Sequence, residues 1–269
     1  MSAPQLPDLQ RAREGAVLLL TLDRPDARNA YSEAMVDSLV RALDDADRDD
    51  DVRCVILTGA GAAFSAGGDL KRMLQQEGMF AGGPVDLRRR YVDGIQRIPR
   101  RLALLEKPVI AAINGAAIGA GLDLACMCDL RLVARGAQLG STFVKVGLVP
   151  GDGGAYFLTR TIGFPRALEL MLTARLIDTD EAERIGLVHR VVEPDELLPA
   201  ARALAEQIAA NAPLAVRLTK RAAYRSYEAD LETALELAAT YQGIVQNTAD
   251  HREAVRALLE RRTPVFTGS

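Results

Sequence analysis

The chain has 269 residues, 49% of them apolar and 26% charged, so it can bury a sizeable core without disulfides or metal ions. Its net charge of −3 provides no general attraction to nucleic acid or to anionic lipid. Three cysteines cannot all pair, and Cys126 and Cys128 lie in an apolar run. We therefore expect reduced thiols and a cytoplasmic protein.

Apolar runs that are typical of strands covered on both faces alternate with helical patterns over the first two thirds of the chain. The expected strands cover residues 16–22, 54–57, 109–113, 130–133 and 188–192. Ser32 offers an N-cap for a helix that carries Met35 and Leu39 on one face. Residues 86–106 are expected to form an exposed, arginine-rich helix. This alternation predicts an α/β fold with mainly parallel strands.

The last quarter of the chain has a different character. No strand pattern follows Val192, and apolar residues such as Leu197 and Leu204 recur at helical spacing. We therefore expect a core domain at residues 1–194 and a C-terminal helical region at residues 195–269. Apolar helical faces of this kind often pack on a neighbouring copy. They can also pack on their own domain, and the sequence leaves both arrangements open.

The glycine-rich loop at residues 59–64 follows a strand, so two common motifs have to be considered. A dinucleotide-binding fingerprint is disfavoured because Phe64 occupies the third glycine position. A nucleophile elbow is disfavoured because Ala63 replaces its first glycine. The chain contains only two histidines, His189 and His251, and neither lies in a pattern typical of a catalytic base.

Two glycine-rich turns, at residues 64–71 and 114–124, each follow a strand and lead toward a helix. Small residues at such a place leave backbone N–H groups unshielded, with the helix dipole behind them. Two convergent N–H groups form an oxyanion hole, which stabilises negative charge on a carbonyl oxygen. Either loop alone would be interpreted as a tight turn. Both together, about 50 residues apart, predict an oxyanion site.

Seven short segments strengthen this interpretation as a combination. They are residues 23–25, 28–30, 64–70, 107–115, 128–131, 147–150 and 262–266. In this order they resemble the crotonase superfamily, that is, the enoyl-CoA hydratase/isomerase family. The resemblance implies an α/β fold that is a spiral of ββα units with a C-terminal helical trimerisation region, assembled as trimers or hexamers. It also implies binding of acyl-CoA thioesters and stabilisation of their enolates.

Carried over position by position, the resemblance assigns the oxyanion-hole N–H groups to Gly68 and Ala120. Ala120 replaces the commoner glycine, an exchange that a backbone donor tolerates when φ is negative. The expected acyl-CoA-binding residues are Ala27, Arg28, Ala30, Ala66, Gly68, Asp69, Leu70, Lys71 and Ala120. We expect no metal and no separate cofactor, because CoA is part of the substrate.

The acid and base residues depart from the pattern of the hydratases, which use two glutamates. The first glutamate corresponds to Asp123, an exchange that resembles the dienoyl-CoA isomerases, and the second corresponds to Phe143. Asp152 is a candidate substitute, although isomerase-type relatives place their aspartate one residue earlier, where Gly151 stands. We expect Asp123 and Asp152 to transfer protons, because burial raises the pKa of a carboxyl toward a useful range. Asp152 could instead cap a helix that begins near Gly153.

The sequence therefore predicts an enzyme that isomerises or hydrates an enoyl-CoA through a thioester enolate. An acyl-CoA thioester hydrolase on the same fold is one alternative, and a non-catalytic CoA- or RNA-binding relative is another. The acidic composition and the lack of a basic–aromatic cluster disfavour RNA. The expected partners are an acyl-CoA substrate and copies of the same chain in a homotrimer or hexamer, with no nucleic acid and no membrane. The acyl chain and the pathway stay open.

Overall fold

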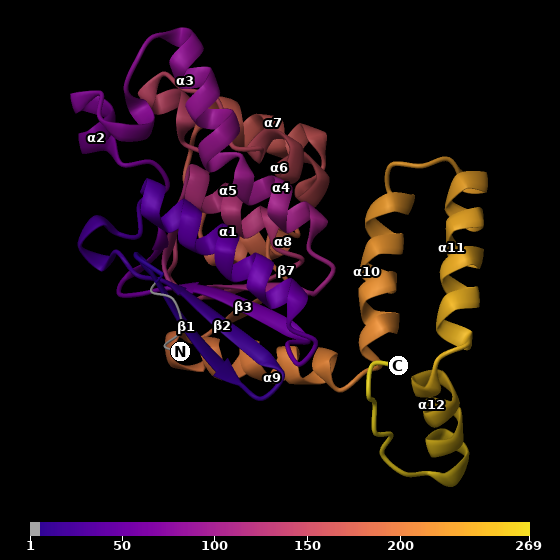
Figure 1. Ribbon diagram of the computed structural model, residues 1–269. Helices are drawn as coiled ribbons and strands as arrows, with labels where there is room; N and C mark the ends of the chain where they lie inside the picture. Colours follow the sequence, from indigo (N-terminus) through magenta and orange to yellow (C-terminus); the bar gives the residue numbers. More distant parts are fainter. Residues whose placement is uncertain (1–5) are drawn as a thin grey trace.

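The computed structural model describes residues 6–269, so the first five residues of the predicted core domain lie outside the described part. Two sheets form the centre of the molecule (Figure 1). The larger has the strand order β1-β2-β3-β5-β7-β9, and all neighbouring strands run parallel except β1 and β2. The smaller is the parallel sheet β4-β6-β8. The strands are β1 Leu9–Glu14, β2 Val17–Leu22, β3 Cys54–Gly59, β4 Ala63–Ser65, β5 Val109–Ile113, β6 Ala116–Ile118, β7 Leu130–Ala134, β8 Leu139–Gly140 and β9 Arg190–Val192.

Five of these strands coincide with the apolar runs of the sequence, and the prediction of a mainly parallel α/β fold is confirmed. The other four strands have no apolar run for a physical reason. β1 lies at the edge of its sheet, and after Leu9 its residues are exposed and mostly polar. β4, β6 and β8 have only two or three residues each, which is too short for a periodic pattern.

The chain winds as a spiral in which a strand of the large sheet leads to a strand of the small sheet and then to a helix. β3 leads to β4 and α2, β5 leads to β6 and α5, and β7 leads to β8 and α6. The helices are α1 Glu33–Arg48, α2 Leu70–Gln75, α3 Pro84–Arg90, α4 Arg97–Leu104, α5 Ala120–Met127, α6 Gly154–Ile162, α7 Phe164–Thr173, α8 Thr179–Arg184, α9 Leu197–Ala209, α10 Pro213–Ser226, α11 Leu231–Gln246 and α12 Ala249–Glu260. Shorter helical turns cover Pro25–Ala27, Gly78–Phe80, Tyr91–Ile95, Phe143–Val146 and Pro194–Glu196. The predicted ββα spiral is confirmed.

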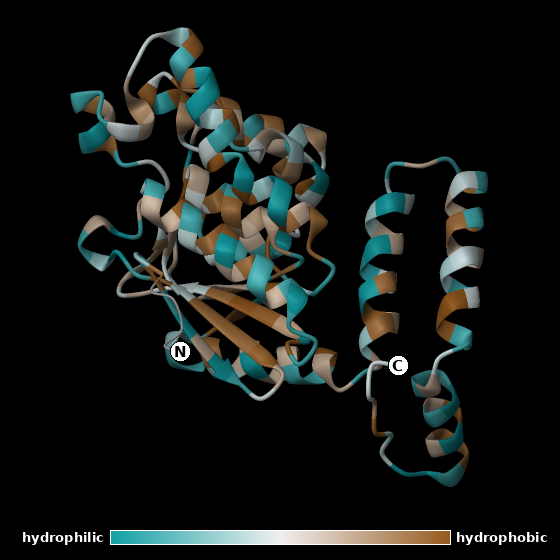
Figure 2. Ribbon diagram, viewed as in Figure 1, coloured by the Kyte–Doolittle hydropathy of each residue, from teal (hydrophilic) through white to brown (hydrophobic). Residues whose placement is uncertain are grey.

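Helices cover both faces of the large sheet, which explains why its central strands are almost entirely apolar (Figure 2). Helices α1, α4 and α5 lie over one face, where Leu18 and Leu39 are part of the main core. Helix α9 covers the other face through Ala201 and Ala205. By these contacts α9 packs on the core sheet, although it follows the boundary expected at residue 195.

The prediction of a single exposed helix over residues 86–106 is wrong. The chain there forms α3, a π-helical turn at Tyr91–Ile95, and α4. The break lies at Gly94, whose angles of φ −110° and ψ −108° are not helical. Beyond the break, Ile98 and Leu102 are buried in the core. The segment therefore joins an exposed outer helix to one that packs inside.

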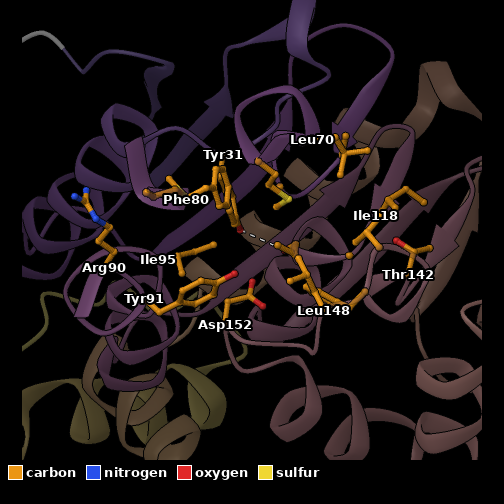
Figure 3. Close-up of a pocket in the computed structure, with 18 residues that line it drawn as sticks. Tyr31, Leu70, Phe80, Arg90, Tyr91, Ile95, Ile118, Thr142, Leu148 and Asp152 are labelled. Carbon is orange, nitrogen blue, oxygen red and sulfur yellow. Dashed lines mark hydrogen bonds between the residues drawn. The ribbon is translucent and has the colours of Figure 1, made fainter. Parts of the chain in front are cut away.

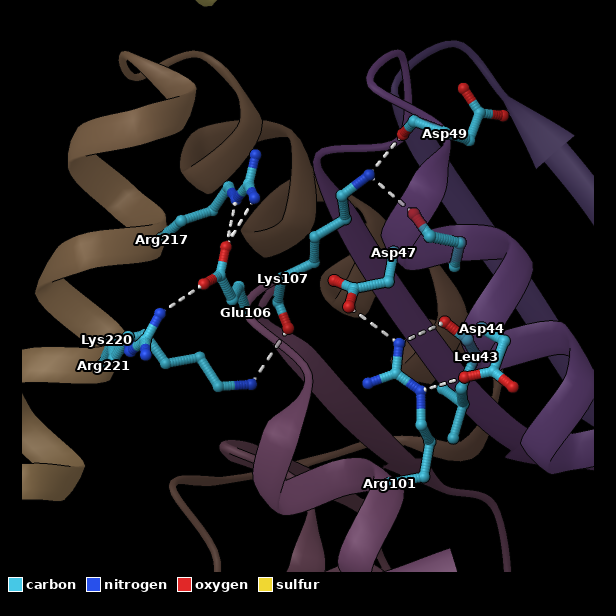
Figure 4. A network of polar contacts seen from close by, with 11 residues as sticks. Leu43, Asp44, Asp47, Asp49, Arg101, Glu106, Lys107, Arg217, Lys220 and Arg221 are labelled. Carbon is cyan, nitrogen blue, oxygen red and sulfur yellow. Dashed lines mark hydrogen bonds and ion pairs between the residues drawn. The ribbon is translucent and has the colours of Figure 1, made fainter.

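Helices α10 to α12 stand apart from the rest of the molecule (Figure 1). Ion pairs attach α10 to the core (Figure 4). The carboxylate of Glu106 accepts hydrogen bonds from Arg217 and from Arg221, the latter at 2.9 Å, and Lys220 Nζ lies 2.7 Å from the carboxylate of Asp129. Polar contacts therefore make a large part of this attachment. Within residues 6–269, no helix combines the length and the apolar character needed to cross a membrane.

Lys107 is buried just before β5 and joins α1 to the sheet (Figure 4). Its Nζ donates hydrogen bonds to the carbonyl oxygen of Ala46, at 2.6 Å, and to that of Asp49. Both carbonyls belong to the C-terminal end of α1, where a cation also interacts favourably with the helix dipole. Lys107 therefore caps α1 from outside the helix.

Candidate active site

A cavity of about 110 Å³ lies where the loops after β4 and β6 come together (Figure 3). Its wall is mainly apolar, with contributions from Leu70, Met73, Met79, Phe80, Ile95 and Leu148. The polar side chains that line it are Tyr31, Arg90, Tyr91, Thr142 and Asp152. Such a lining suits a hydrocarbon chain that is oriented by a few polar groups.

The two glycine-rich loops of the sequence contact each other at this cavity. Gly67 has φ +79°, and a Cβ at this position would lie 2.5 Å from the carbonyl oxygen of Ile118 and 2.9 Å from the amide nitrogen of Ala120. A Cβ at Gly121 would lie 2.1 Å from the carbonyl oxygen of Ser65. Only glycine fits at these two positions, and the missing side chains let the loops approach closely.

Hydrogen bonds fix the peptide group that carries the first predicted donor. The carbonyl of Gly67 shares its peptide group with the N–H of Gly68, and it accepts a hydrogen bond from the N–H of Tyr31 at 2.8 Å. The loop is fixed further by Ser65, whose hydroxyl accepts from the Gly67 N–H at 3.1 Å and donates to the carbonyl of Asn29 at 2.8 Å. The Gly68 N–H is thereby directed away from its own loop.

The second predicted donor is fixed in the same way. The carbonyl of Gly119 shares its peptide group with the N–H of Ala120, and it accepts from the N–H of Asp123 at 3.0 Å. Among residues 6–269, neither the Gly68 nor the Ala120 N–H has a protein acceptor. Gly68 and Ala120 both line the cavity. A donor that is polarised at its carbonyl end and lacks an acceptor is suited to bind an oxyanion.

The two predicted acids lie together, but only one of them reaches the cavity. Asp152 lines the cavity, whereas Asp123 lies behind it within hydrogen-bonding reach of Asp152. The exposed fractions are 2% for Asp152 and 0% for Asp123. A Cβ at Gly154 would lie 2.1 Å from an Asp123 carboxyl oxygen, so the bare start of α6 makes room for this side chain.

The carboxyl oxygens of both aspartates lack hydrogen-bond donors in the described part of the chain. The capping interpretation of Asp152 is therefore not supported: Gly153 is the N-cap of α6, and no side chain caps this helix. Burial raises the pKa of Asp152. Burial and then the negative charge of Asp152 raise the pKa of Asp123 well above its usual range. Two adjacent carboxylates in a dry interior repel strongly, so a pair of this kind retains one proton to a higher pH than a free carboxyl does.

Three aromatic residues complete the surroundings of Asp152. Phe143, which the resemblance assigns to the position of the second hydratase glutamate, lines the cavity with a ring that cannot carry a proton. Tyr31 and Tyr91 line it as well, and sequence reasoning missed both. Tyr31 follows the landmark at residues 28–30 directly, which was the one available signal. Tyr91 lies in the arginine-rich segment, where no motif marks it.

The residues expected to bind acyl-CoA divide into two groups. Ala66, Gly68, Leu70 and Ala120 line the cavity. The others lie outside its lining: Ala27, Arg28, Ala30, Asp69 and Lys71. The two walls of the expected groove are joined by a hydrogen bond from the Ala66 N–H to the carbonyl of Arg28 at 2.9 Å. Asp69 is the N-cap of α2, and Lys71 is exposed.

The arrangement of sheets and loops is that of the crotonase fold. The structure superposes on a solved enoyl-CoA hydratase from Bacillus anthracis with a TM-score of 0.92 and 36% identity, over 97% of this chain and 100% of that one. The family described as enoyl-CoA hydratase/isomerase matches residues 12–269. The chain belongs to the enoyl-CoA hydratase/isomerase family. The predicted family, fold class and enzyme class are thus confirmed.

Two curated relatives show the range of reactions within this similarity. The short-chain-enoyl-CoA hydratase of Clostridium acetobutylicum is 39% identical over 251 residues, which are 93% of this chain and 94% of that protein. The 1,2-epoxyphenylacetyl-CoA isomerase of Escherichia coli is 38% identical over 256 residues, which are 95% of this chain and 96% of that protein. Hydratases and isomerases are similar to this chain to nearly the same degree.

Proposed function

We propose that the protein binds an acyl-CoA thioester and holds the enolate of its thioester carbonyl between the N–H groups of Gly68 and Ala120. One observation carries this proposal. Two N–H donors without protein acceptors in the described chain converge with one buried carboxyl, Asp152, on a largely apolar cavity. The donors match the oxygen of an enolate, and the carboxyl can move the proton that enolate formation releases.

The proposed reaction moves a double bond along the acyl chain. Asp152 removes a proton from the carbon next to the thioester carbonyl, and the electron pair moves onto the carbonyl oxygen. The two N–H groups stabilise that oxygen, and a donor of this kind contributes about 10²–10³ in rate. The carbonyl re-forms as Asp152 returns the proton two carbons further along the chain. The 3,4 double bond becomes a 2,3 double bond, and no atom is gained or lost.

Phe143 supports a double-bond shift over hydration. The shift needs one proton carrier, and Asp152 is the only carboxyl among the described residues that line the cavity. Hydration remains the second candidate because a relative named as a hydratase is 39% identical. Hydration requires a further group that holds the water. A thioester hydrolase is a third outcome that the same oxyanion site permits.

Asp123 acts through Asp152 in this proposal. It does not line the cavity, so we assign it a positioning role in which the two carboxyls share one proton. The shared proton keeps the buried pair from carrying two negative charges. It also leaves Asp152 able both to accept and to return a proton.

Several expectations from the sequence belong to the proposal as well. The acyl-CoA-binding role of the residues around Arg28 and Lys71 stays a prediction, with CoA as part of the substrate and no separate cofactor. The C-terminal helical region is proposed to assemble three or six copies, because Leu231, Leu258 and Leu259 are 69%, 80% and 81% exposed. A cytoplasmic location is in keeping with three free thiols.

A panel of thioesters in deuterated water tests the proposed function. The wild-type protein is incubated with 2-enoyl-, 3-enoyl- and 3-hydroxyacyl-CoA of matched chain length, and the products are analysed by mass spectrometry. A double-bond shift changes the chromatographic retention time of the thioester, and its mass changes only by the deuterium that it takes up. Hydration adds one water, and hydrolysis releases free CoA, which a thiol reagent detects. If no thioester exchanges deuterium or reacts, the enolate proposal is wrong.

A further inference from the structure

Three side chains with terminal oxygen atoms converge in the otherwise apolar cavity. They are Tyr31, Tyr91 and Asp152, and we call them the polar corner (Figure 3). They come from three separate segments: the stretch before α1, the π-helical turn and the loop before α6. The hydroxyls of both tyrosines point toward the Asp152 carboxyl, whereas Thr142 lies on the other side of the cavity (Figure 3).

Tyr31 fixes the position of the polar corner relative to the oxyanion site. It is 1% exposed, and its hydroxyl donates a hydrogen bond to the carbonyl of Ala120 at 3.4 Å. Its N–H holds the peptide group that carries the Gly68 donor. The polar corner therefore lies beside the proposed place of the thioester carbonyl. The second and third carbons of an acyl chain would lie next to it.

Tyr91 occupies a space that Gly151 provides. A Cβ at Gly151 would lie 2.8 Å from Cε1 of the Tyr91 ring. The Gly151 peptide is in turn fixed by Gln96, whose Nε2 donates to the Gly151 carbonyl at 2.8 Å. Among residues 6–269, the Tyr91 hydroxyl makes no hydrogen bond. Glycine at position 151 thus places a free hydroxyl opposite Asp152.

The polar corner offers both hydrogen-bond donors and acceptors, which suits a ligand oxygen atom that carries hydrogen. Burial raises the pKa of both tyrosines, and the negative charge of Asp152 adds to this, so both stay protonated at neutral pH. The Tyr31 hydroxyl donates its hydrogen bond to the carbonyl of Ala120, so its oxygen can still accept one. Tyr91 is free to donate, and Asp152 accepts. One hydroxyl or water can therefore satisfy a donor and an acceptor at once.

We propose that the polar corner binds one oxygen atom at the third carbon of the acyl chain, and that Tyr31 and Tyr91 determine this specificity. The ligand is the hydroxyl of a 3-hydroxyacyl thioester or the water that becomes this hydroxyl. The inference rests on the proposed acyl-CoA function. It concerns the second candidate reaction, hydration, and leaves the double-bond shift at Asp152 as proposed.

Binding affinities test the polar corner without reference to turnover. Titration calorimetry measures the Kd of butyryl-CoA and of each enantiomer of 3-hydroxybutyryl-CoA. The wild type should prefer one hydroxylated enantiomer over butyryl-CoA by about tenfold. Tyr31→Phe and Tyr91→Phe should each reduce this preference by about threefold or more, with the Kd of butyryl-CoA unchanged. Gly151→Ala should act like Tyr91→Phe because it displaces the ring.

Tyr156→Phe is the matched control, because Tyr156 is 45% exposed on α6 and lies outside the cavity lining. It should keep the wild-type preference, and thermal unfolding should show that all four variants fold. The oxygen can come from a bound 3-hydroxyacyl thioester or from water, and incubation of crotonyl-CoA in ¹⁸O water distinguishes the two. Appearance of ¹⁸O in 3-hydroxybutyryl-CoA shows that the polar corner takes its oxygen from water. Equal wild-type affinities, or a preference that survives in both phenylalanine variants, would overturn the polar corner. Failure of every thioester to bind would overturn the acyl-CoA function with it.

Discussion

Asp123 and Asp152 face each other in the protein interior, and neither carboxyl accepts a hydrogen bond from a donor in the described chain. They come from different turns of the spiral: Asp123 lies in α5, which follows β6, and Asp152 lies in the loop between β8 and α6. A pair of carboxyls without a counter-charge is unfavourable for folding, because burial penalises the charged form. The same penalty raises the pKa of a proton carrier toward neutrality, where it is most effective.

The pairing predicts how the pH dependence changes when Asp123 is replaced. Burial raises the pKa of Asp152, and the proton held between the two carboxyls lowers it. Asp123→Leu removes this proton, so the pKa of Asp152 should rise and the acid limb of kcat/KM should move to higher pH. An acid limb that stays at the wild-type pH in Asp123→Leu would contradict the coupling. Asp123→Asn can still donate a hydrogen bond through its amide, so its acid limb should stay near the wild-type pH.

The same substitution should raise stability at neutral pH. Asp123 has a raised pKa in the folded protein, so its contribution is fully present below the unfolded value of about 3.9 and is lost as the pH rises through the folded value. Asn does not titrate and avoids this loss. The difference in Tm between Asp123→Asn and the wild type should therefore grow in favour of the variant from pH 4 to pH 8. Thermal unfolding at both pH values measures it, and a constant difference would refute the raised pKa.

The contact between the two oxyanion loops predicts a specific effect at Gly67. Gly67→Ala places a Cβ 2.5 Å from the carbonyl oxygen of Ile118, which forces the donors at Gly68 and Ala120 apart. We expect kcat to fall by about 10²–10³, the contribution of one oxyanion donor. Gly136→Ala is the control: Gly136 also has positive φ, +87°, but nothing lies within 4 Å of its Cβ position. It should lose stability to a similar backbone strain yet keep its kcat, and an equal loss of kcat in both variants would count against the oxyanion role.

Lys107 predicts a change in stability alone. Lys107→Met removes the donor for the last carbonyls of α1 and leaves them buried without a partner. The free energy of unfolding should fall by about 1–3 kcal/mol. Turnover at a temperature where the variant is folded should not change, because Lys107 does not line the cavity. Lys145→Met, at an exposed position, should leave the unfolding free energy nearly unchanged in the same denaturant titration.

The sequence predicted the parts of the structure that leave a local pattern. Buried strands such as Val109–Ile113 appear as apolar runs, and the glycines around Gly67 mark a close approach of two backbones. The break at Gly94 was missed because one glycine within a charged segment does not distinguish a helix from a π-helical turn. Tyr91 was missed for a different reason. Its position depends on a contact with Gly151, 60 residues away along the chain, and such a contact has no local signal.

The arrangement of the two acids also depends on contacts that leave no local signal in the sequence. Asp123 and Asp152 could each be singled out from the resemblance to known enzymes. Which of them faces the cavity depends on how α6 packs against α5, since the start of α6 at Gly154 lies against the Asp123 carboxyl. The tertiary packing therefore makes Asp152 the residue on the substrate side and Asp123 the one behind it.

Hydrogen exchange at the second carbon of a bound thioester tests the central claim most directly. Butyryl-CoA has no double bond to move, so its exchange in deuterated water reports enolate formation alone. The wild-type protein should exchange one proton for deuterium, as mass spectrometry detects. Asp152→Asn should exchange at least about 10² times more slowly while its Kd for butyryl-CoA stays within about twofold of the wild type. Exchange at the wild-type rate in Asp152→Asn would show that another group moves the proton.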